Sequence, residues 1–347
     1  MSKVSGHDFV HSISEMMMKM AKEDIYDIAV NHHLDIARET PKQDLAEALN
    51  SILVEDFEKD GEYLLLDEFL FLAFVFLQFE QRSASSTAHV LQAILNQYHY
   101  KVNDEDGEWL IRRGYFQILK ENAENVLLYP YPLIFHSFLN HITQWLARAT
   151  RHQKMVDLLL ALTNIYGFFS YSQYVHVWNL YNDDDIITEE SVSEFFTQIM
   201  PKGLHFYLSN KHVINDIISL KEFGSLYEGS KTLPWYTPSE EMIEKHAHAL
   251  IDTHSHEYKA LKMFFKKNKG NIRSNKEMDT IVDHLALELK FNSPPSDIME
   301  ILYENNYRFD QDEIVQEFLL HYQKISDNTR KWVYKGFTPV EIKQFML

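Results

Sequence analysis

The sequence predicts a mainly helical, multi-module all-α protein with two short β-hairpins. The 347 residues include only 10 glycines and 9 prolines, so few residues interrupt helices. Apolar residues recur at intervals of three and four along most of the chain, which is the spacing of amphipathic helices. A hydrophobic content of 45% is sufficient for packed cores and argues against disorder. At about 100–200 residues per domain, the length suggests two or three domains.

The first region, residues 1–58, is expected to contain two helices. Residues 8–31 carry apolar side chains at helical spacing. A second helix should follow Thr40, which can cap it, with Pro41 in its first turn. Both helices have an apolar face, so we expect them to pack together.

This region resembles the helix–extended–helix pattern of Rho N-terminal and SAP-like domains. The resemblance covers about thirty residues and rests on Ile25, Ile28, Ala29, Leu34, Ile36, Lys42, Leu45 and Leu49. Two positions depart from the family, since Asp35 replaces the usual glycine and the connecting loop is shorter. The resemblance implies nucleic-acid contact near Lys42, but Glu39, Asp44 and Glu47 surround that lysine.

Two stretches share one order of elements, which predicts a repeated unit in residues 59–145 and 146–225. The first has expected helices at 67–80, 87–99 and 104–113, followed by a hairpin. The second has a helix ending at Gly167, a helix from Tyr171 to Tyr181, a helix capped by Thr188, and a hairpin turning at Ser209 and Asn210. Three helices and a hairpin form the outline of a winged helix, a shape that often binds DNA.

The charge of these units opposes DNA binding. Residues 104–113 carry four acids against Arg112 and Arg113, and residues 188–200 carry three acids and no base. The formal net charge of the chain is -18. Acids beside phosphates repel them and release no counterions. We therefore expect the two units to act as a packing scaffold or a protein-contact surface.

The last region, residues 226–347, is expected to be helical after a linker at 221–238. Helices are predicted at 239–251, 255–267, 275–290, 295–304 and 310–334, and a final helix should begin at Thr338 and Pro339. The tail resembles a segment of uncharacterised proteins from Gram-positive (Firmicutes) bacteria and phages, through Asn328, Trp332, Gly336, Thr338, Pro339, Glu341 and Ile342. In that family it lies near SEC-C zinc motifs, whose cysteines this chain lacks.

One basic stretch is the candidate for contact with nucleic acid or an acidic partner. It contains Lys259, Lys262, Lys266, Lys267, Lys269, Arg273 and Lys276 without an intervening acid. The competing interpretation is a solvated helix end, where lysines are favoured by the helix dipole. If the protein binds nucleic acid, this stretch and Lys42 are the expected contacts.

Four histidines in eleven residues raise the possibility of a metal site at His246, His248, His254 and His256. Histidines two positions apart point in nearly opposite directions on a helix, so a break near Asp252 would be needed to gather them. The more ordinary interpretation is a set of partly exposed histidines on two helices. No cofactor is therefore expected.

The sequence provides no starting point for catalysis. It has no cysteine, no Walker loop, no G-x-G-x-x-G and no G-x-S-x-G. No targeting signal is evident, and the apolar stretch 64–79 is shorter than the ~20 residues that span a bilayer. The favoured hypothesis is a non-enzymatic regulatory or interaction protein that binds a protein partner in a bacterial or phage cytoplasm, without membrane contact. A nucleic-acid-associated regulator and a metal-dependent enzyme are the alternatives.

Overall fold

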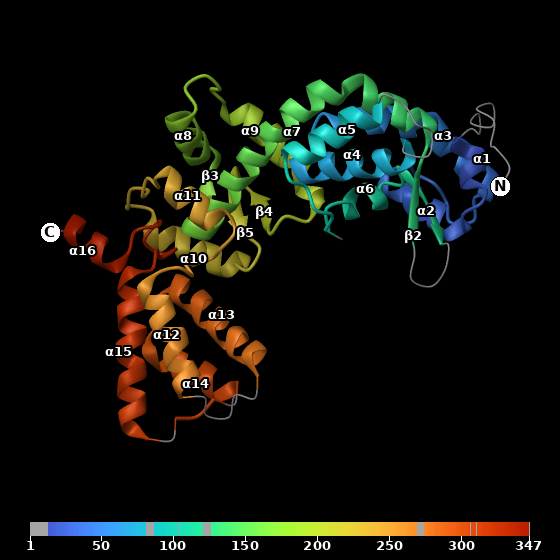
Figure 1. Cartoon of the computed structure of the whole chain (residues 1–347). Helices are drawn as coiled ribbons and strands as arrows, with labels where there is room; N and C mark the ends of the chain where they lie inside the picture. The colour runs from blue at the N-terminus through green and yellow to red at the C-terminus, as the bar shows by residue number, and fades with distance from the viewer. Residues whose placement is uncertain are drawn as a thin grey trace. The chain divides into compact units, whose positions relative to one another are not determined.

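The computed structural model describes residues 13–80, 87–103, 105–120, 126–268, 274–305, 307–309 and 311–346. The chain divides into two compact units, Met1–Lys154 and Met155–Leu347. Both are built mainly from helices, which confirms the all-α prediction (Figure 1). Among the described residues, no helix has the length and apolar character required to cross a membrane.

The first unit consists of helices and one antiparallel hairpin. Strand β1 pairs with β2, with Ile118 opposite Leu128. The elements of this unit are α1 (Ile13–Met17), α2 (Lys22–Asn31), α3 (Lys42–Gly61), α4 (Leu66–Glu80), α5 (Thr87–Gln97), α6 (Glu108–Arg112), β1 (Phe116–Lys120), β2 (Val126–Pro130) and the first part of α7 (Pro132–Tyr166).

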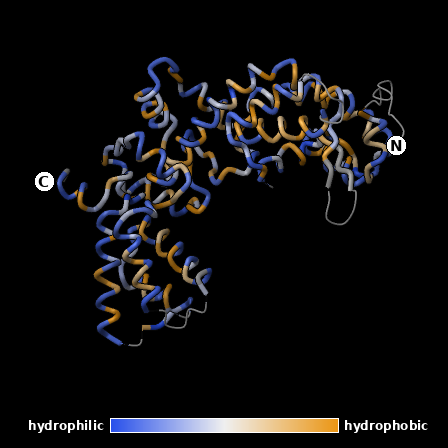
Figure 2. Tube along the Cα trace, viewed as in Figure 1, coloured by the Kyte–Doolittle hydropathy of each residue, from blue (hydrophilic) through white to orange (hydrophobic). Residues whose placement is uncertain are grey.

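Helix α4 lies in the core of the first unit. Its sequence is apolar on nearly every side, as Figure 2 shows by its mostly hydrophobic colouring. Such a helix must be covered all round, and Phe69, Leu72 and Phe76 have no exposed surface. Phe76 packs against Phe135 and Phe138 of α7. The apolar stretch at 64–79 therefore belongs largely to a buried core helix.

Three helix boundaries in the first unit differ from the prediction. The single helix expected at 8–31 is two helices, α1 and α2, separated between Met17 and Lys22; residues 8–12 lie outside the described part of the chain. Helix α6 covers Glu108–Arg112, shorter than the expected 104–113. Helix α7 begins at Pro132 and runs through the expected boundary between residues 145 and 146. Proline fits the first turn of a helix because its missing N–H has no acceptor there.

The second unit contains a three-stranded antiparallel sheet in the order β3-β5-β4. Strand β3 was not predicted. Its three residues are too short to show an alternating pattern, and it is held by pairing of Phe169 with Val213. The elements are β3 (Phe168–Ser170), α8 (Tyr171–Tyr181), α9 (Glu189–Ile199), the 3-10 helix η1 (Met200–Lys202), β4 (Phe206–Ser209), β5 (His212–Asn215), α10 (Leu220–Ser230), α11 (Glu240–Ala247), α12 (His256–Lys267), α13 (Asn275–Phe291), α14 (Pro295–Glu304), α15 (Asp312–Asn328) and α16 (Pro339–Met346).

The predicted linker at 221–238 was wrong in its first half, which forms α10. The side chain of Ser219 accepts from the backbone of Glu222, and the Glu222 side chain accepts from the backbone of Ser219. This capping box satisfies backbone donors at the start of the helix. Leu226 and Ser230 are buried, so packing holds the helix despite two glycines on its exposed side.

Helices α12 and α15 lie side by side (Figure 1) and share the core with α13 and α14. Phe264, Phe265 and Phe318 form the centre of this core. Helix α15 ends at Asn328, earlier than the expected 334. Residues 329–338 form turns instead, in which Gly336 has a φ of 85°.

Candidate functional site

A cavity of about 250 Å³ lies within the second unit, between α11, α12, α13 and the end of α15. We call it the C-terminal cavity. Apolar residues such as Ile251 and Ile325 form part of its wall. Its principal polar wall residues are His246, Asp252, Glu257, Lys290, Asn328 and Arg330.

Lys290 is the most unusual residue of the cavity wall. Its side chain is completely buried, and its Nζ has no hydrogen-bond partner among the described residues. Burial, together with the nearby charges of Arg330 and Lys331, lowers the pKa of Lys290 well below its ordinary value. A buried amine without a partner is costly, because it has lost its hydration and gained no bond.

His246 lies in the last turn of α11 and is buried near Lys290. Its Nδ1 lies 3.1 Å from the carbonyl oxygen of Ala249. A carbonyl only accepts, so Nδ1 carries the proton and the neutral ring keeps Nε2 as an acceptor. Burial, and next the charge of Lys290, lower the pKa of His246 to about 3. The ring is therefore neutral near pH 7.

Arg330 is held rigidly at the cavity by three kinds of contact. It donates to the carbonyl oxygen of Gly336 at 2.7 Å and forms a two-pronged ion pair with Glu341 at 3.0 and 3.2 Å. Its guanidinium also lies 3.5 Å from the ring centre of Tyr236. Glu341 offsets the charge of Arg330, whereas Nζ of Lys290 has no hydrogen-bond partner among the described residues.

Two acids also belong to the cavity wall. Asp252 accepts from the backbone N–H of His254 at 2.9 Å and lies 3.8 Å from Nζ of Lys245. Glu257 is partly exposed in the first turn of α12. The cavity wall therefore carries two carboxylates, while the side chain of Lys290 is buried without accessible surface.

The four candidate metal-binding histidines do not come together. The helix does break between them, since α11 ends at Ala247 and α12 begins at His256. However, His246 is buried while His248, His254 and His256 are exposed. In the described part of the chain, no group of three or more histidines and carboxylates is arranged to hold a metal ion.

The basic stretch is partly occupied by internal ion pairs. Nζ of Lys262 lies 2.7 Å from Asp279, and Nζ of Lys267 lies 3.4 Å from Glu317. Lys259, Lys266 and Lys276 are exposed, whereas Lys269 and Arg273 lie outside the described residues. Lys42 donates to the backbone carbonyl of Met18 at 2.8 Å. Of the six predicted cations that the structure describes, three are therefore engaged in contacts within the chain, and Lys259, Lys266 and Lys276 are exposed outside them.

The acidic helices of the two repeated stretches keep their acids at the surface. Glu189, Glu190 and Glu194 are exposed on α9. In the first stretch, Arg113 follows α6 but its side chain is only 13% exposed and binds Asp60 at 2.8 Å. The element order of both stretches agrees with the expected order, apart from β3. Their winged-helix assignment, the four-part domain division and the Rho/SAP-like assignment stay predictions.

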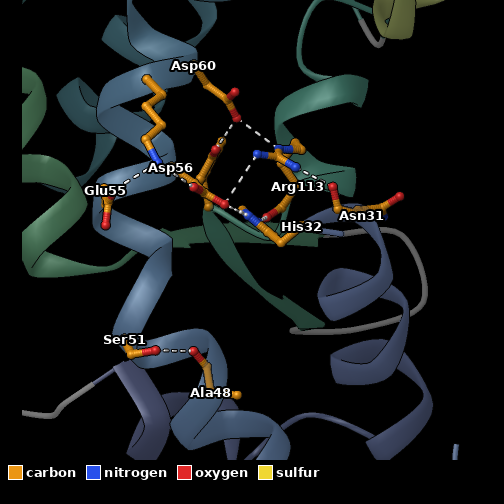
Figure 3. A network of polar contacts seen from close by, with 10 residues as sticks. Asn31, His32, Ala48, Ser51, Glu55, Asp56, Asp60 and Arg113 are labelled. Atoms are coloured by element: carbon orange, nitrogen blue, oxygen red, sulfur yellow. Dashed lines mark hydrogen bonds and ion pairs between the residues drawn. The ribbon is translucent and has the colours of Figure 1, made fainter. Parts of the chain in front are cut away.

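A buried polar network in the first unit was not foreseen from the sequence (Figure 3). His32, which follows α2, has one ring nitrogen 2.7 Å from a carboxylate oxygen of Asp56 and the other 2.7 Å from the carbonyl of Arg113. Arg113 and the hydroxyl of Tyr115 both donate to Asp60. The His32 side chain has no exposed surface. This network joins α2, α3 and the end of α6.

An exposed apolar group lies at the start of α10. We call Ile217, Leu220, Phe223 and Tyr227 the α10 patch. Leu220, Phe223 and Tyr227 are spaced by three and four residues and so share one helix face. Ile217, Leu220 and Tyr227 are 50%, 68% and 41% exposed. Phe223 packs edge-on against the buried Phe168, 5.3 Å between ring centres, which fixes the patch to the core.

Comparisons with known proteins give no relative for this chain. No family model, no curated protein and no solved structure matches it. The functional conclusions below therefore depend on the residues and their geometry.

Proposed function

We propose that this protein is a non-enzymatic regulatory or interaction protein that binds a protein partner through the α10 patch. The observation that carries the proposal is the exposure of Ile217, Leu220 and Tyr227, the last two of which lie on one face of α10. Grouped apolar side chains at a protein surface are typical of protein-binding sites. Tyrosine is also enriched among the residues that dominate binding energy.

The surroundings of the patch favour a protein over a nucleic acid. Asp216, Glu222 and Glu228 are exposed near it, as are Lys221 and Lys231. Lys231 is paired with Glu228 at 2.6 Å. Mixed charge around an apolar centre resembles the polar rim of a protein interface. The resemblance of the tail to a Gram-positive bacterial family is the ground for proposing a bacterial or phage cytoplasm.

The test is a capture experiment with the double variant Leu220→Glu/Tyr227→Glu. Wild-type protein immobilised on a resin and incubated with extract from the source cell should retain a specific partner, whether or not the extract is treated with nuclease. The double variant should lose it, because two charges would be buried at the interface. The matched control is Leu320→Glu, since Leu320 is 65% exposed on α15 of the same unit. Equal retention by the double variant and the wild type would contradict the proposal.

Nucleic-acid binding is the second candidate, and the exposed Lys259 and Lys266 on α12 are the observation that favours it. Two cations on one helix face could contact phosphates. Gel retardation of DNA and RNA fragments, comparing wild type with Lys259→Glu/Lys266→Glu, tests it. Two results together would favour this function over the first. The wild type should retard the fragments while the double variant does not, and nuclease treatment should abolish retention of the partner in the capture experiment.

A further inference from the structure

Strand β4 forms an open edge of the sheet in the second unit. The strand order is β3-β5-β4, so β5 pairs with one side of β4 and no described strand pairs with the other side. The opposite edge strand, β3, has only three residues and lies in the chain directly between α7 and α8. The sequence of β4 contains neither a charged residue nor a proline, which commonly block pairing at an edge. β4 is therefore the edge that can accept another strand.

The hydrogen bonds of the sheet show which backbone groups of β5 face β4. Backbone groups of successive residues in a strand point alternately to its two sides. The N–H of Asn215 donates to the carbonyl of Gly167, next to β3, and the N–H of Asp216 donates to the carbonyl of His205, next to β4. Even-numbered residues of β5 therefore face β4, and odd-numbered residues face β3.

The same alternation assigns the backbone groups of β4. Tyr207 and Ser209 lie opposite even-numbered residues of β5, so their backbone groups face that strand. The N–H and carbonyl of Leu208 and the carbonyl of Phe206 then point to the open side. These three groups have no hydrogen-bond partner among the described residues. Leu208 thus presents one donor and one acceptor, which are the groups that an added strand pairs with.

The α10 patch begins beside this edge. The hydroxyl of Tyr207 donates to the carbonyl of Ile218 at 2.8 Å, which ties the segment between Ile217 and Leu220 to β4. Tyr207 also packs with the apolar cluster under α10, so it lies on the sheet face that this helix covers. Every second side chain of an added strand would point to the same face, toward the exposed Ile217 and Leu220.

Acidic side chains lie near the start of the edge. Asp216 is exposed, and its carboxylate lies 3.0 Å from the imidazole of the histidine before β4. Burial, and next the charge of Glu222, raise the pKa of the Tyr207 hydroxyl, so Glu222 is also near this strand. Lys221 precedes Phe223, which packs on the sheet, by two positions. It is therefore about 200° around the helix and points away from the sheet. The charge at this end of the edge favours a basic partner residue.

We propose that the partner of the α10 patch supplies an extended segment, which adds to the open edge of β4 as a fourth strand of the sheet. The backbone of the segment pairs with the N–H and carbonyl of Leu208. Its alternate side chains are apolar and lie beside Ile217 and Leu220, and a lysine or arginine faces Asp216 and Glu222. In this mode of recognition, backbone hydrogen bonds supply affinity and side chains supply specificity. The inference rests on the proposed function, because it names the kind of segment that the patch receives.

The first test follows backbone amide hydrogen exchange in the full-length protein by NMR. In the free protein, the amides of Tyr207 and Ser209 should exchange slowly, because they face β5, and that of Leu208 should exchange rapidly. The probe is a synthetic peptide of alternating valine and threonine with a lysine at each end. At millimolar concentration it should slow exchange at Leu208 at least about tenfold. A Leu208 amide that is already slow in the free protein, or that the peptide leaves fast, would overturn the proposal.

Two variants separate the backbone of Leu208 from its side chain. Leu208→Pro removes the outward N–H but no bond to β5, and proline is tolerated at the edge of a sheet. Leu208→Ala is the matched control, since it shortens the side chain and keeps the N–H. Fluorescence anisotropy of the labelled peptide should show at least about tenfold weaker binding by Leu208→Pro than by Leu208→Ala. Equal affinities would contradict the proposal, and the exchange measurement decides it if Leu208→Pro does not fold.

A second peptide tests the charge of the segment. The same sequence with a glutamate at each end should bind the wild type more weakly than the lysine peptide, and the difference should shrink at high salt. Equal binding of the two peptides at low salt would contradict the assignment of a basic residue.

The capture experiment distinguishes this inference from the proposed function. A partner that Leu220→Glu/Tyr227→Glu loses, but that Leu208→Pro and Leu208→Ala retain equally, would uphold the α10 patch and overturn the added strand. Loss by Leu208→Pro with retention by Leu208→Ala would support the added strand. If the wild type retains no partner, the proposed function fails, and the exchange and anisotropy measurements still decide whether the edge of β4 accepts a strand.

Discussion

Nδ1 of His32 lies 2.7 Å from a carboxylate oxygen of Asp56, while Nε2 of the same ring lies 2.7 Å from the carbonyl oxygen of Arg113. Both neighbours are acceptors, so both nitrogens are satisfied when the ring donates twice. One buried side chain thus joins three helices of the first unit.

Replacing His32 with alanine should destabilise the first unit. The change leaves the Arg113 carbonyl without its donor and removes one partner of Asp56, so we expect a loss of about 2–3 kcal/mol in unfolding free energy. Urea titration followed by circular dichroism measures this. His89→Ala is the control, because His89 is exposed on α5. Equal midpoints for the two variants would show that the network contributes nothing.

Gly167 should not tolerate alanine. Its φ is +76°, and an added Cβ would lie 2.6 Å from atoms of the Trp332 ring. The strained backbone alone costs about 1–2 kcal/mol, and the clash raises the total to about 3 kcal/mol or more. Gly203→Ala separates the two effects, since Gly203 has a φ of +79° and nothing within 4 Å of the added Cβ. In thermal unfolding, the melting temperature of Gly167→Ala should therefore lie well below that of Gly203→Ala.

His246 should make the second unit less stable in acid. Its pKa is lowered from 6.5 to about 3 in the folded chain, so the unfolded chain binds a proton first as the pH falls. Stability is then lost between pH 6.5 and 3, and about 2 kcal/mol of it is lost by pH 5. Urea titrations give the unfolding free energy at pH 7 and at pH 5. His246→Gln should reduce the difference between these two free energies by about 2 kcal/mol. His254→Gln, at an exposed position, should keep it.

Lys290→Met should stabilise the protein. The substitution keeps an unbranched side chain that is one atom shorter and removes an amine that has no hydrogen-bond partner among the described residues, which we expect to raise the unfolding free energy by about 1 kcal/mol or more. Lys331→Met should not stabilise, because it breaks the bond to Ser326. A destabilised Lys290→Met protein would mean that the amine has a favourable contact in the folded chain.

Local patterns predicted most of the helices in this chain. Thr188 was recognised as a cap, and its side chain accepts the expected backbone N–H. Pro339 was recognised as the start of the last helix. Helix α10 was missed because its glycines suggested a linker, although the Ser219 and Glu222 pair that caps it was present in the sequence.

The C-terminal cavity could not be predicted, because it depends on contacts between distant parts of the chain. His246 was selected as one of four histidines for a metal site, and its neighbour in the fold is Lys290. The sequence did hold one signal, since Lys290 continues the apolar stripe of Val282 and Ala286. The cavity itself forms only where residues of α11 and α13 meet Arg330 in the folded chain, and the sequence does not show this meeting.

The ion pair between Arg330 and Glu341 has a practical consequence for anyone who shortens this protein. Glu341 lies in the last helix, close to the end of the sequence. A chain cut before that residue would keep every wall residue of the cavity, yet it would leave the guanidinium without its counterion. Such a shortened protein would be expected to attract anions that the full-length protein rejects, so ligand screens should retain the complete C-terminal helix.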